Sequence, residues 1–326
     1  MVTHHEERRF FSRLIRLAFV AVSLATVLAL FSPVYWFAEL FSHFRFYYLL
    51  AQALLVLIFL HSERHVLMAC TLLLAIPNAW YVVPYLTPLV LESSATADEQ
   101  FDGIDVVALN VNYRNDDHAS VREYLQSTAA DVIVVSEMTA VWQAALRVLD
   151  ADYPYQLGRS QPDPWGLRVY SRLPFVDSEL FDLGVAGTVH ARLVLESAGK
   201  QFQLFAVHLN SPTTSQRAAN RSTQLAELGR RLKGSHVPSA VVGDLNLTPF
   251  SPYFDRLLVT GNVVDARRPA GFHFTWPTHP VPLWIPIDHV LAHPALRVRN
   301  VRRGRDAGSD HYPLEFSLAC CIPDAG

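Results

Sequence analysis

The chain has 326 residues and a formal net charge of −3, and its part from residue 96 onward holds slightly more acidic than basic residues. This balance argues against the broad electropositive face that duplex-binding proteins use. Hydrophobic residues make up 51% of the chain and the mean hydropathy is +0.17, which is high for a wholly soluble protein.

The apolar excess lies in three runs near the start of the chain, at residues 14–31, 44–60 and 66–91. Each run can supply the roughly 17–25 residues that a helix needs to cross a bilayer, so we predict three transmembrane helices in a membrane domain at 1–92. A cleavable signal peptide is the alternative for the first run, and a buried helical hairpin is the alternative for the other two. Pro77, Pro84 and Pro88 make a kink or an early end of the third helix plausible.

Basic residues predict the orientation of these helices. Arg8, Arg9 and Arg13 precede the first run and Arg16 lies at its start, Arg64 follows the second run, and the next Lys or Arg after the third run is Arg114; Arg45 departs from this pattern. Because positive charges stay on the cytoplasmic side, the residues after the third helix are expected on the opposite face. In a bacterium the chain would be a multi-pass inner-membrane protein with a periplasmic domain. We predict a linker at 93–103, this domain at 104–320 and a tail at 321–326.

Short apolar strands alternate with helices after the linker, which predicts an α/β domain. Strands are expected at 104–111, 131–136, 166–171, 191–196, 201–208, 239–242, 285–291, 296–302 and 314–318. Helices are expected at 119–128, near 140, at 214–232 and near 251–258. Three cysteines, Cys70, Cys320 and Cys321, form neither a disulfide framework nor a metal-binding spacing.

At least five of the predicted strands end in polar side chains, and one more polar side chain lies within a further strand. They are Asn110, Glu137, His208, Asp244 with Asn246, Asp310 with His311, and Asp288 inside its strand. Because open α/β sheets bind ligands at their carboxyl ends, one shared site would explain all of them.

Each of these residues also has a structural interpretation when it is taken alone. Asp244 and Asn246 are typical turn formers. Glu137 suits the N-cap of the next helix, and a single histidine such as His208 is more often structural than catalytic. All of these independent explanations would have to coincide, which favours the shared site.

The chemistry of this residue set suits a metal and a phosphate. Carboxylate and amide oxygens bind Mg²⁺, which is typically held by one or two carboxylates and substrate phosphate. A histidine beside a carboxylate can hydrogen-bond or protonate an anionic oxygen. The chain has no G-x-S-x-G, P-loop or Rossmann glycine motif. We therefore predict metal-assisted attack of water on a phosphate ester.

Seven motifs resemble those of the endonuclease/exonuclease/phosphatase superfamily, which includes deoxyribonuclease I, apurinic endonucleases, inositol polyphosphate 5-phosphatases and neutral sphingomyelinases. In chain order they are N-x-N, VVSE, SRLP, VHLN, VVGDLNLTPFSP, PIDHV and GSDHYPLEF, spanning roughly residues 104–318. The resemblance implies a four-layer α/β sandwich of two packed mixed β-sheets flanked by helices. Within the superfamily the chain is most similar to bacterial membrane-anchored members.

The resemblance also implies a metal site and a water site. Glu137 is the expected main Mg²⁺ ligand, with Asn110 and Asp310 as further ligands, and Mn²⁺ is an alternative ion. Asp244 is expected to orient or deprotonate the attacking water. Asn246 is expected to position the water and the phosphate.

The histidines are implied to act on the phosphate. His311, held by Asp288, is expected to contact the scissile phosphate, and His208 to add a second contact that stabilises the transition state. His289 should face the other side of its strand and be structural. Arg217 could reach substrate phosphate, but a solvated helix face is the preferred interpretation.

The predicted function is a membrane-anchored, Mg²⁺-dependent phosphoesterase acting on a phosphate ester, with a phosphodiester favoured. A nuclease outside the cytoplasm is one alternative, although the near-neutral domain supplies no clear basic groove or aromatic platform. A catalytically inactive, membrane-tethered binding module is another. Such a module should have lost Glu137, Asp244, Asp310 or His311, and all four are present. The sequence leaves open the substrate and the oligomeric state.

Overall fold

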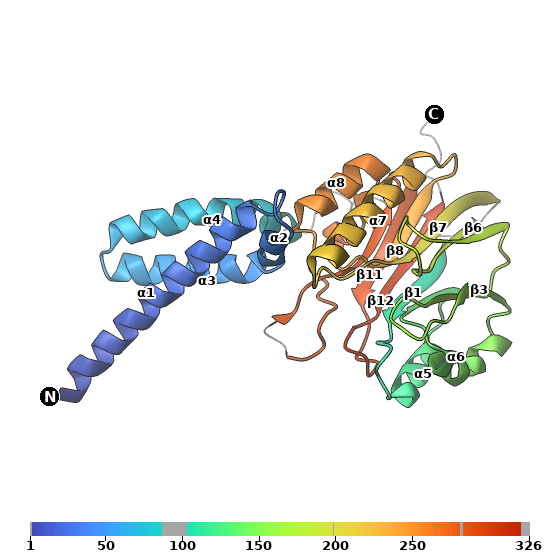
Figure 1. Ribbon diagram of the computed structural model, residues 1–326, viewed down its shortest axis with the longest axis horizontal. Coiled ribbons are helices and arrows are strands. Elements are labelled where there is room, and N and C mark those ends of the chain that lie inside the picture. Colours follow the sequence, from blue (N-terminus) through green and yellow to red (C-terminus); the bar gives the residue numbers. More distant parts are fainter. Residues whose placement is uncertain (1, 87–102, 198, 281–282, 321–326) are drawn as a thin grey trace, which may run out of the picture. The chain divides into compact units, whose positions relative to one another are not determined.

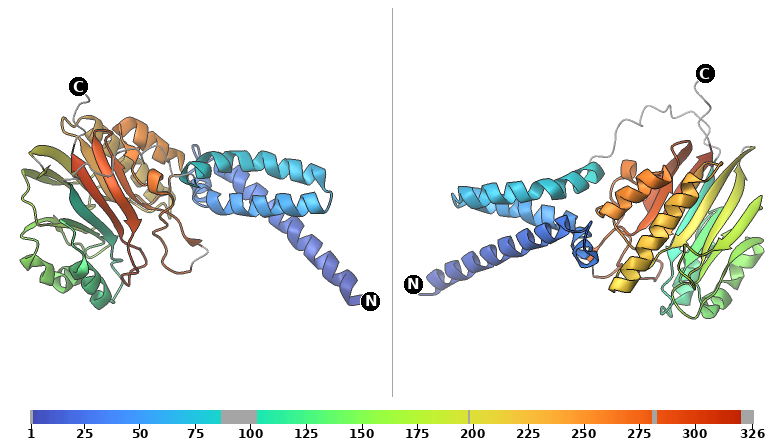
Figure 2. Two further views of the ribbon diagram at one scale, coloured as in Figure 1. Left: turned by 180° about the vertical axis from the view of Figure 1, so that it is seen from behind. Right: turned by 45° about the horizontal axis from the view of Figure 1, so that its top comes forward.

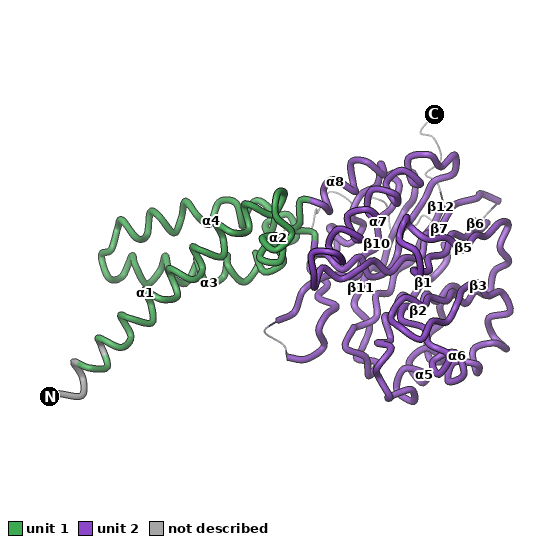
Figure 3. Tube along the Cα trace, viewed as in Figure 1, with its two compact units in different colours: residues 1–86, 249–252 green, residues 87–248, 253–326 purple. Residues whose placement is uncertain are grey.

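The computed structural model describes residues 2–86, 103–197, 199–280 and 283–320, and it divides into two compact units (Figure 3). Unit 1 comprises residues 1–86 and 249–252, and unit 2 comprises residues 87–248 and 253–326. The predicted linker, apart from residue 103, and the predicted tail at 321–326 lie outside the described residues.

Unit 1 is helical, with α1 (Val2–Leu30), α2 (Trp36–Ser42), α3 (Arg45–His61) and α4 (His65–Leu86). Among the described residues, two segments are each long and apolar enough to cross a membrane, Arg9–Leu30 and His65–Leu86. Helices α2 and α3 pass that test only as a pair bent by 58°. The structure therefore holds two candidate spans, or three if the bent pair counts as one.

Polar side chains are buried between the helices of unit 1. Arg45 donates to Asn78 Oδ1 at 3.1 Å and to the Ala29 carbonyl at 2.9 Å. Asn78 Nδ2 in turn donates to Gln52 Oε1 and to Thr26 Oγ1, both at 3.0 Å. Hydrogen bonds of this kind hold helices together in a lipid environment. Arg45, which departed from the charge pattern of the sequence, is thus a buried packing residue, 2% exposed.

Unit 2 is built on two six-stranded mixed sheets. The first sheet contains β1 (Ile104–Asn110), β2 (Val132–Ser136), β3 (Tyr155–Arg159), β4 (Leu167–Ser171), β11 (Leu296–Arg303) and β12 (Leu314–Cys320), in the order β11-β12-β1-β2-β4-β3. The second contains β5 (Asp177–Phe181), β6 (His190–Ser197), β7 (Lys200–His208), β8 (Ser239–Asp244), β9 (Val264–Asp265) and β10 (Asp288–Ala292), in the order β5-β6-β7-β8-β10-β9. Strands β1 and β2, and likewise β7 and β8, run parallel.

Two pairs of helices cover the outer faces of the two sheets (Figures 1 and 2). Helices α5 (His118–Ser127) and α6 (Ala140–Ala145) pack on the β1 sheet, and α7 (Ser215–Lys233) and α8 (Pro252–Gly261) pack on the β8 sheet. Successive residues along a strand face different layers of the sandwich. Val106 and Val242 meet in the core between the sheets, whereas Val107 and Val241 face the helices. The predicted four-layer α/β sandwich is confirmed.

Three strands that the sequence did not predict, β3, β5 and β9, all lie at sheet edges. Strands β3 and β5 are half exposed, and β9 has only two residues. An edge strand needs fewer apolar side chains because water covers part of it, so the hydrophobic pattern that marks a strand in sequence is weak there.

Gly243 in β8 lies where the backbone approaches the neighbouring strand most closely. Its φ is +130°, and a Cβ placed there would lie 2.0 Å from the carbonyl oxygen of Val207 in β7. Gly243→Ala is therefore expected to lower stability by about 2 kcal/mol or more, measured by denaturant unfolding. Gly187→Ala is the matched control, because Gly187 also has a positive φ but no atom near the added Cβ. Equal losses of stability in the two variants would contradict the predicted steric clash at position 243.

Candidate active site

Three neighbouring strands bring three polar side chains to one level. Strand β7 ends at His208 and β8 at Asp244, and these two residues are partners in the parallel register. Strand β10 runs antiparallel to β8, and its first residue, Asp288, is the partner of Asp244 on the other side. The sequence placed Asp288 inside a strand. The strand instead begins there, because Pro286 has no N–H to donate and Ile285 forms a bridge with Trp276.

The β1 sheet contributes Asn110, the last residue of β1, and Glu137, which follows β2. Asn110 Nδ2 donates to Glu137 Oε1 at 3.0 Å and to Asp244 Oδ2 at 3.3 Å, so this amide connects the carboxylates of the two sheets. The backbone N–H of Asn112 donates to Asn110 Oδ1 at 3.0 Å, which fixes the orientation of the amide.

Glu137 leaves the strand in a left-handed backbone conformation, with a φ of +61°. Its second oxygen, Oε2, accepts from the backbone N–H of Tyr113 at 2.8 Å. The N-cap of α6 is Thr139, which accepts from the N–H of Trp142. Glu137 is thus free of the capping role that was its alternative interpretation, and its carboxylate points to the site.

Asp244 and Asn246 form a turn and also belong to the site. Asn246 has a φ of +50°, and its N–H donates to Asp244 Oδ1 at 2.7 Å, which is the turn interpretation. Its side-chain Nδ2 donates to the Leu209 carbonyl at 2.9 Å and to Asp244 Oδ2 at 3.2 Å. The turn therefore holds Asp244 with Oδ2 toward Asn110, and this carboxylate is 2% exposed.

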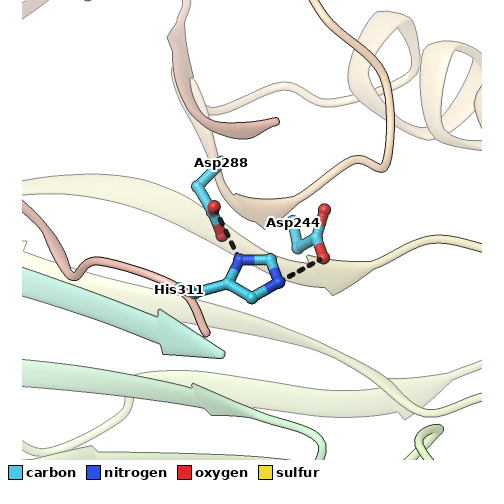
Figure 4. Close-up of side chains that lie close together, drawn as sticks. All are labelled: Asp244, Asp288 and His311. Atoms are coloured by element: carbon cyan, nitrogen blue, oxygen red, sulfur yellow. Dashed lines mark hydrogen bonds and ion pairs between the residues drawn. The ribbon is translucent and has the colours of Figure 1, made fainter. Parts of the chain in front are cut away.

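His311 lies between two carboxylates, as Figure 4 shows. Its Nδ1 hydrogen-bonds Asp288 Oδ2 at 2.9 Å, and its Nε2 lies 3.8 Å from Asp244 Oδ2. The segment that carries His311 is attached to β1, because Ser309 Oγ donates to the Asn110 carbonyl at 2.7 Å. The neighbouring Asp310 accepts from Trp276 Nε1 through Oδ2 at 3.1 Å.

His208 points its Nε2 toward two carboxylates, 3.6 Å from Asp244 Oδ2 and 3.8 Å from Glu137 Oε1. Its Nδ1 lies 3.1 Å from the Pro164 carbonyl. A carbonyl can only accept, so the proton on Nδ1 is fixed. His289, by contrast, bonds the Leu247 carbonyl at 2.8 Å and packs on Phe254, away from the site, as expected from its place in the strand.

The model of the Endonuclease/Exonuclease/phosphatase family matches residues 107–311, which include all of these strand ends. The chain belongs to the endonuclease/exonuclease/phosphatase family. Members of this family are typically hydrolases that act on phosphate esters. No curated protein sequence matches the chain significantly.

Solved structures support the family's fold. A humanized TDP2 of D. rerio is similar with a TM-score of 0.56 and 18% identity, over 67% of this chain and 99% of that chain. Sphingomyelinase C from Streptomyces griseocarneus has a TM-score of 0.51 and 19% identity, over 66% and 99%. An endonuclease/exonuclease/phosphatase from Beutenbergia cavernae has a TM-score of 0.52 and 19% identity, over 68% and 72%. At these identities the likeness shows the fold alone.

Three buried residues of this family member, Asp244, His311 and Asp288, have pKa values shifted from their ordinary values. Burial, and then the charge of Asp288, raise the pKa of Asp244 to about 6 despite two nearby histidines. Burial opposes the charged form of His311, but the charge and hydrogen bond of Asp288, followed by Asp244 and Asp310, outweigh it and raise the pKa of His311 to about 10. Burial also opposes ionisation of Asp288, yet His311 lowers its pKa. His311 and Asp288 are therefore a charged pair beside a carboxylate that can take up a proton near neutral pH.

A cation could be held here by a group of three residues or by the separate carboxylate of Glu137. The group consists of Asp244, Asp288 and His311, whose ligand atoms lie within 4.8 Å of one another. Its His311 Nδ1 is already bonded to Asp288, and a protonated histidine is no ligand. Glu137 lies outside that group, and its carboxylate has no Lys or Arg ion pair among the described residues. Glu137 thus fits a divalent cation better.

Several groups at the site, both side-chain and backbone, were missed or left without a role by the sequence-based prediction. Trp276 bonds Asp310, Thr275 Oγ1 accepts from the Asp288 N–H at 3.2 Å, and the Tyr113 N–H bonds Glu137. They lie on loops, where no strand end marks them. The tripeptide 275–277 (TWP) was the visible signal for two of them.

Proposed function

We propose that this family member is a membrane-anchored, Mg²⁺-dependent phosphoesterase that hydrolyses a phosphodiester by metal-assisted attack of water. One observation carries the proposal: the carboxylate of Asp244 lies between the His311–Asp288 pair and Asn110, which bonds Glu137. A base, a cationic donor and a metal-binding carboxylate are the groups that this reaction needs.

In the proposal Glu137 holds the ion together with Asp310, whose oxygen Oδ2 is oriented by Trp276. Asn110 was expected to be a further ligand. Its Oδ1 already accepts from Asn112, so we assign it the task of holding Glu137 against Asp244. When bound, Mg²⁺ (or Mn²⁺) would neutralise charge on the phosphate and polarise it for attack.

The side chains of the protein accept the proton of the attacking water and stabilise the charge on the phosphate. Asp244 orients the attacking water and accepts its proton, and Asn246 fixes the Asp244 carboxylate through two hydrogen bonds. His311, kept charged by Asp288, donates from Nε2 to a phosphate oxygen. His208 donates its Nδ1–H to the Pro164 carbonyl, and only in the doubly protonated form of its ring does Nε2–H act as the second donor to the phosphate in the pentavalent transition state.

The apolar helices of unit 1 support membrane anchoring, and the arginine distribution supports an orientation with the hydrolase domain outside the cytoplasm, which is the periplasm in a bacterium. An alkaline phosphatase reporter fused to the C-terminus tests this orientation, because that enzyme is active only after export. An inactive reporter on a stably expressed fusion would contradict it.

A metal-dependent substrate screen tests the activity. The full-length protein, purified in detergent, is assayed with Mg²⁺, with Mn²⁺ and with EDTA on phosphomonoesters, phosphodiesters, nucleic acid and phospholipids. Metal-dependent hydrolysis in at least one group is expected. No hydrolysis in any group would overturn the proposal and favour a binding module of the same fold.

Replacement of the proposed metal ligand is expected to weaken metal binding directly. Glu137→Gln should raise the Kd for Mn²⁺ or Mg²⁺ by about 10-fold or more, measured by calorimetry, because a neutral amide replaces the carboxylate of the main proposed ligand. Glu123→Gln, at a side chain that is 78% exposed, is the control and should leave the Kd unchanged. If Asp288→Asn weakens metal binding and Glu137→Gln does not, the ion is bound by the group of Asp244, Asp288 and His311.

A further inference from the structure

The loop between β3 and β4 places the indole of Trp165 beside His208. The two ring centroids lie 5.6 Å apart. The loop is tied to both sheets: Gln161 N and Gly166 O bond the backbone of Met138, which follows Glu137, and Pro164 O lies 3.1 Å from His208 Nδ1. Trp165 is therefore fixed next to the proposed phosphate donor, and it is only partly buried.

Arg217, in the first turn of α7, lies over the same ring. Its guanidinium carbon is 5.7 Å from the Trp165 ring centroid, so it lies no more than about 11 Å from the His208 ring. Arg217 is exposed, and its NH1 donates to Thr213 Oγ1 at 3.4 Å. In the described part of the chain, no carboxylate forms an ion pair with it, whereas Arg230 and Arg231 further along α7 pair with Glu227.

The charge of Arg217 above Trp165 is complementary to a phosphate and not to a choline group. A choline group binds through an open aromatic face, and a guanidinium over that face repels a second cation. A phosphate is complementary to the same guanidinium, because arginine donates two parallel hydrogen bonds to it. One such cation serves a single phosphate and does not make the long basic groove that duplex DNA needs.

We propose that Trp165 and Arg217 form a subsite for a second phosphate, adjacent to the scissile phosphodiester, so that the enzyme prefers substrates with two neighbouring phosphates over choline esters. Trp165 orients the guanidinium, and Arg217 binds the second phosphate. The inference rests on the phosphoesterase function proposed above. Neighbouring phosphates occur both in oligonucleotides and in lipids such as cardiolipin.

Matched substrate pairs test the subsite in the full-length protein with Mg²⁺. The nucleotide arm compares thymidine 5′-(p-nitrophenyl phosphate) with its 3′-phosphorylated form, and the lipid arm compares phosphatidylglycerol with cardiolipin in mixed micelles. In at least one arm the second phosphate is expected to raise kcat/KM by about 10-fold or more. The arm that responds identifies the source of the substrate. Faster hydrolysis of p-nitrophenyl phosphorylcholine than of either two-phosphate substrate would overturn the proposal.

Variants assign the preference to Arg217. Arg217→Gln should remove the 10-fold preference while leaving kcat/KM on the single-phosphate member within about twofold of wild type, and Arg217→Lys should retain part of it. Arg230→Gln, at an exposed arginine on the same helix, is the control and should retain all of it. If Arg217→Gln lowers both members of a pair equally, or neither, the proposal is wrong.

A binding measurement separates this proposal from the proposed catalytic function. In the nucleotide arm, thymidine 3′,5′-bisphosphate should bind the wild-type protein at least about 10-fold more tightly than thymidine 5′-monophosphate. In the lipid arm, cardiolipin should likewise bind more tightly than phosphatidylglycerol. At least one of these differences is expected, and Arg217→Gln should abolish it. A protein that hydrolyses nothing but shows this difference would retain the subsite and refute the catalysis. Equal affinities for both members in both arms would refute the subsite.

Discussion

Asp244→Asn is expected to lower the rate of metal-dependent hydrolysis by about 10² or more while the protein remains folded. The amide cannot accept the proton of the attacking water, and it presents a donor where Asp244 Oδ2 now accepts from Asn110 at 3.3 Å. The measurement is kcat on whichever substrate the screen identifies, at saturating Mg²⁺. Asp182→Asn, at an exposed carboxylate, should keep wild-type kcat.

The pH dependence of stability distinguishes loss of the base from loss of the fold. The folded pKa of Asp244, about 6, lies above its ordinary value of 3.8 because of burial and then Asp288. Its contribution to stability is therefore fully present below pH 3.8 and is lost as the pH rises through about 6. In EDTA, the melting temperature of Asp244→Asn should fall less than that of wild type between pH 4 and pH 7. A folded Asp244→Asn variant that keeps wild-type kcat would contradict the role of Asp244 as base.

The positions of most candidate site residues could be predicted, because the polar residue types suited to this chemistry stand at the ends of apolar strands. Asp244, His208 and Asn110 each end an apolar strand, and parallel neighbours bring such ends to one edge. The pattern does not give hydrogen-bond directions. That Asn110 presents Nδ2 to Glu137 depends on the N–H of Asn112, which donates to Oδ1 of the same amide.

Loops and helix packing were less predictable for a different physical reason. Trp165 reaches His208 because Gly166 packs against Met138, where a Cβ would lie 2.0 Å from the carbonyl oxygen. Such a contact joins segments that are distant in sequence, and no periodicity encodes it. Hydropathy likewise located the apolar segments but not the 58° bend between α2 and α3, because composition does not specify where a helix breaks.

The charged pair of His311 and Asp288 underlies the second large expected effect, which is the effect of replacing His311. His311→Asn is expected to lower kcat by about 10² or more, because the amide cannot supply the charged donor that the phosphate needs. It should also destabilise the domain by about 3 kcal/mol at neutral pH, since Asp288, 3% exposed, would remain as a buried charge without its partner at 2.9 Å. Denaturant unfolding in EDTA measures this loss, and the exposed His236→Asn serves as control.

A double replacement and a pH series test that coupling. His311→Asn with Asp288→Asn should destabilise less than the sum of the single changes, because neither charge is then left alone. The folded pKa of His311, about 10, exceeds its ordinary 6.5, so its stabilisation is complete below pH 6.5 and is lost as the pH rises through about 10. Wild-type stability should decline over this interval more steeply than that of His311→Asn. Additive losses together with parallel pH profiles would show that the two side chains do not act as a charged pair, and the donor role of His311 would fail with it.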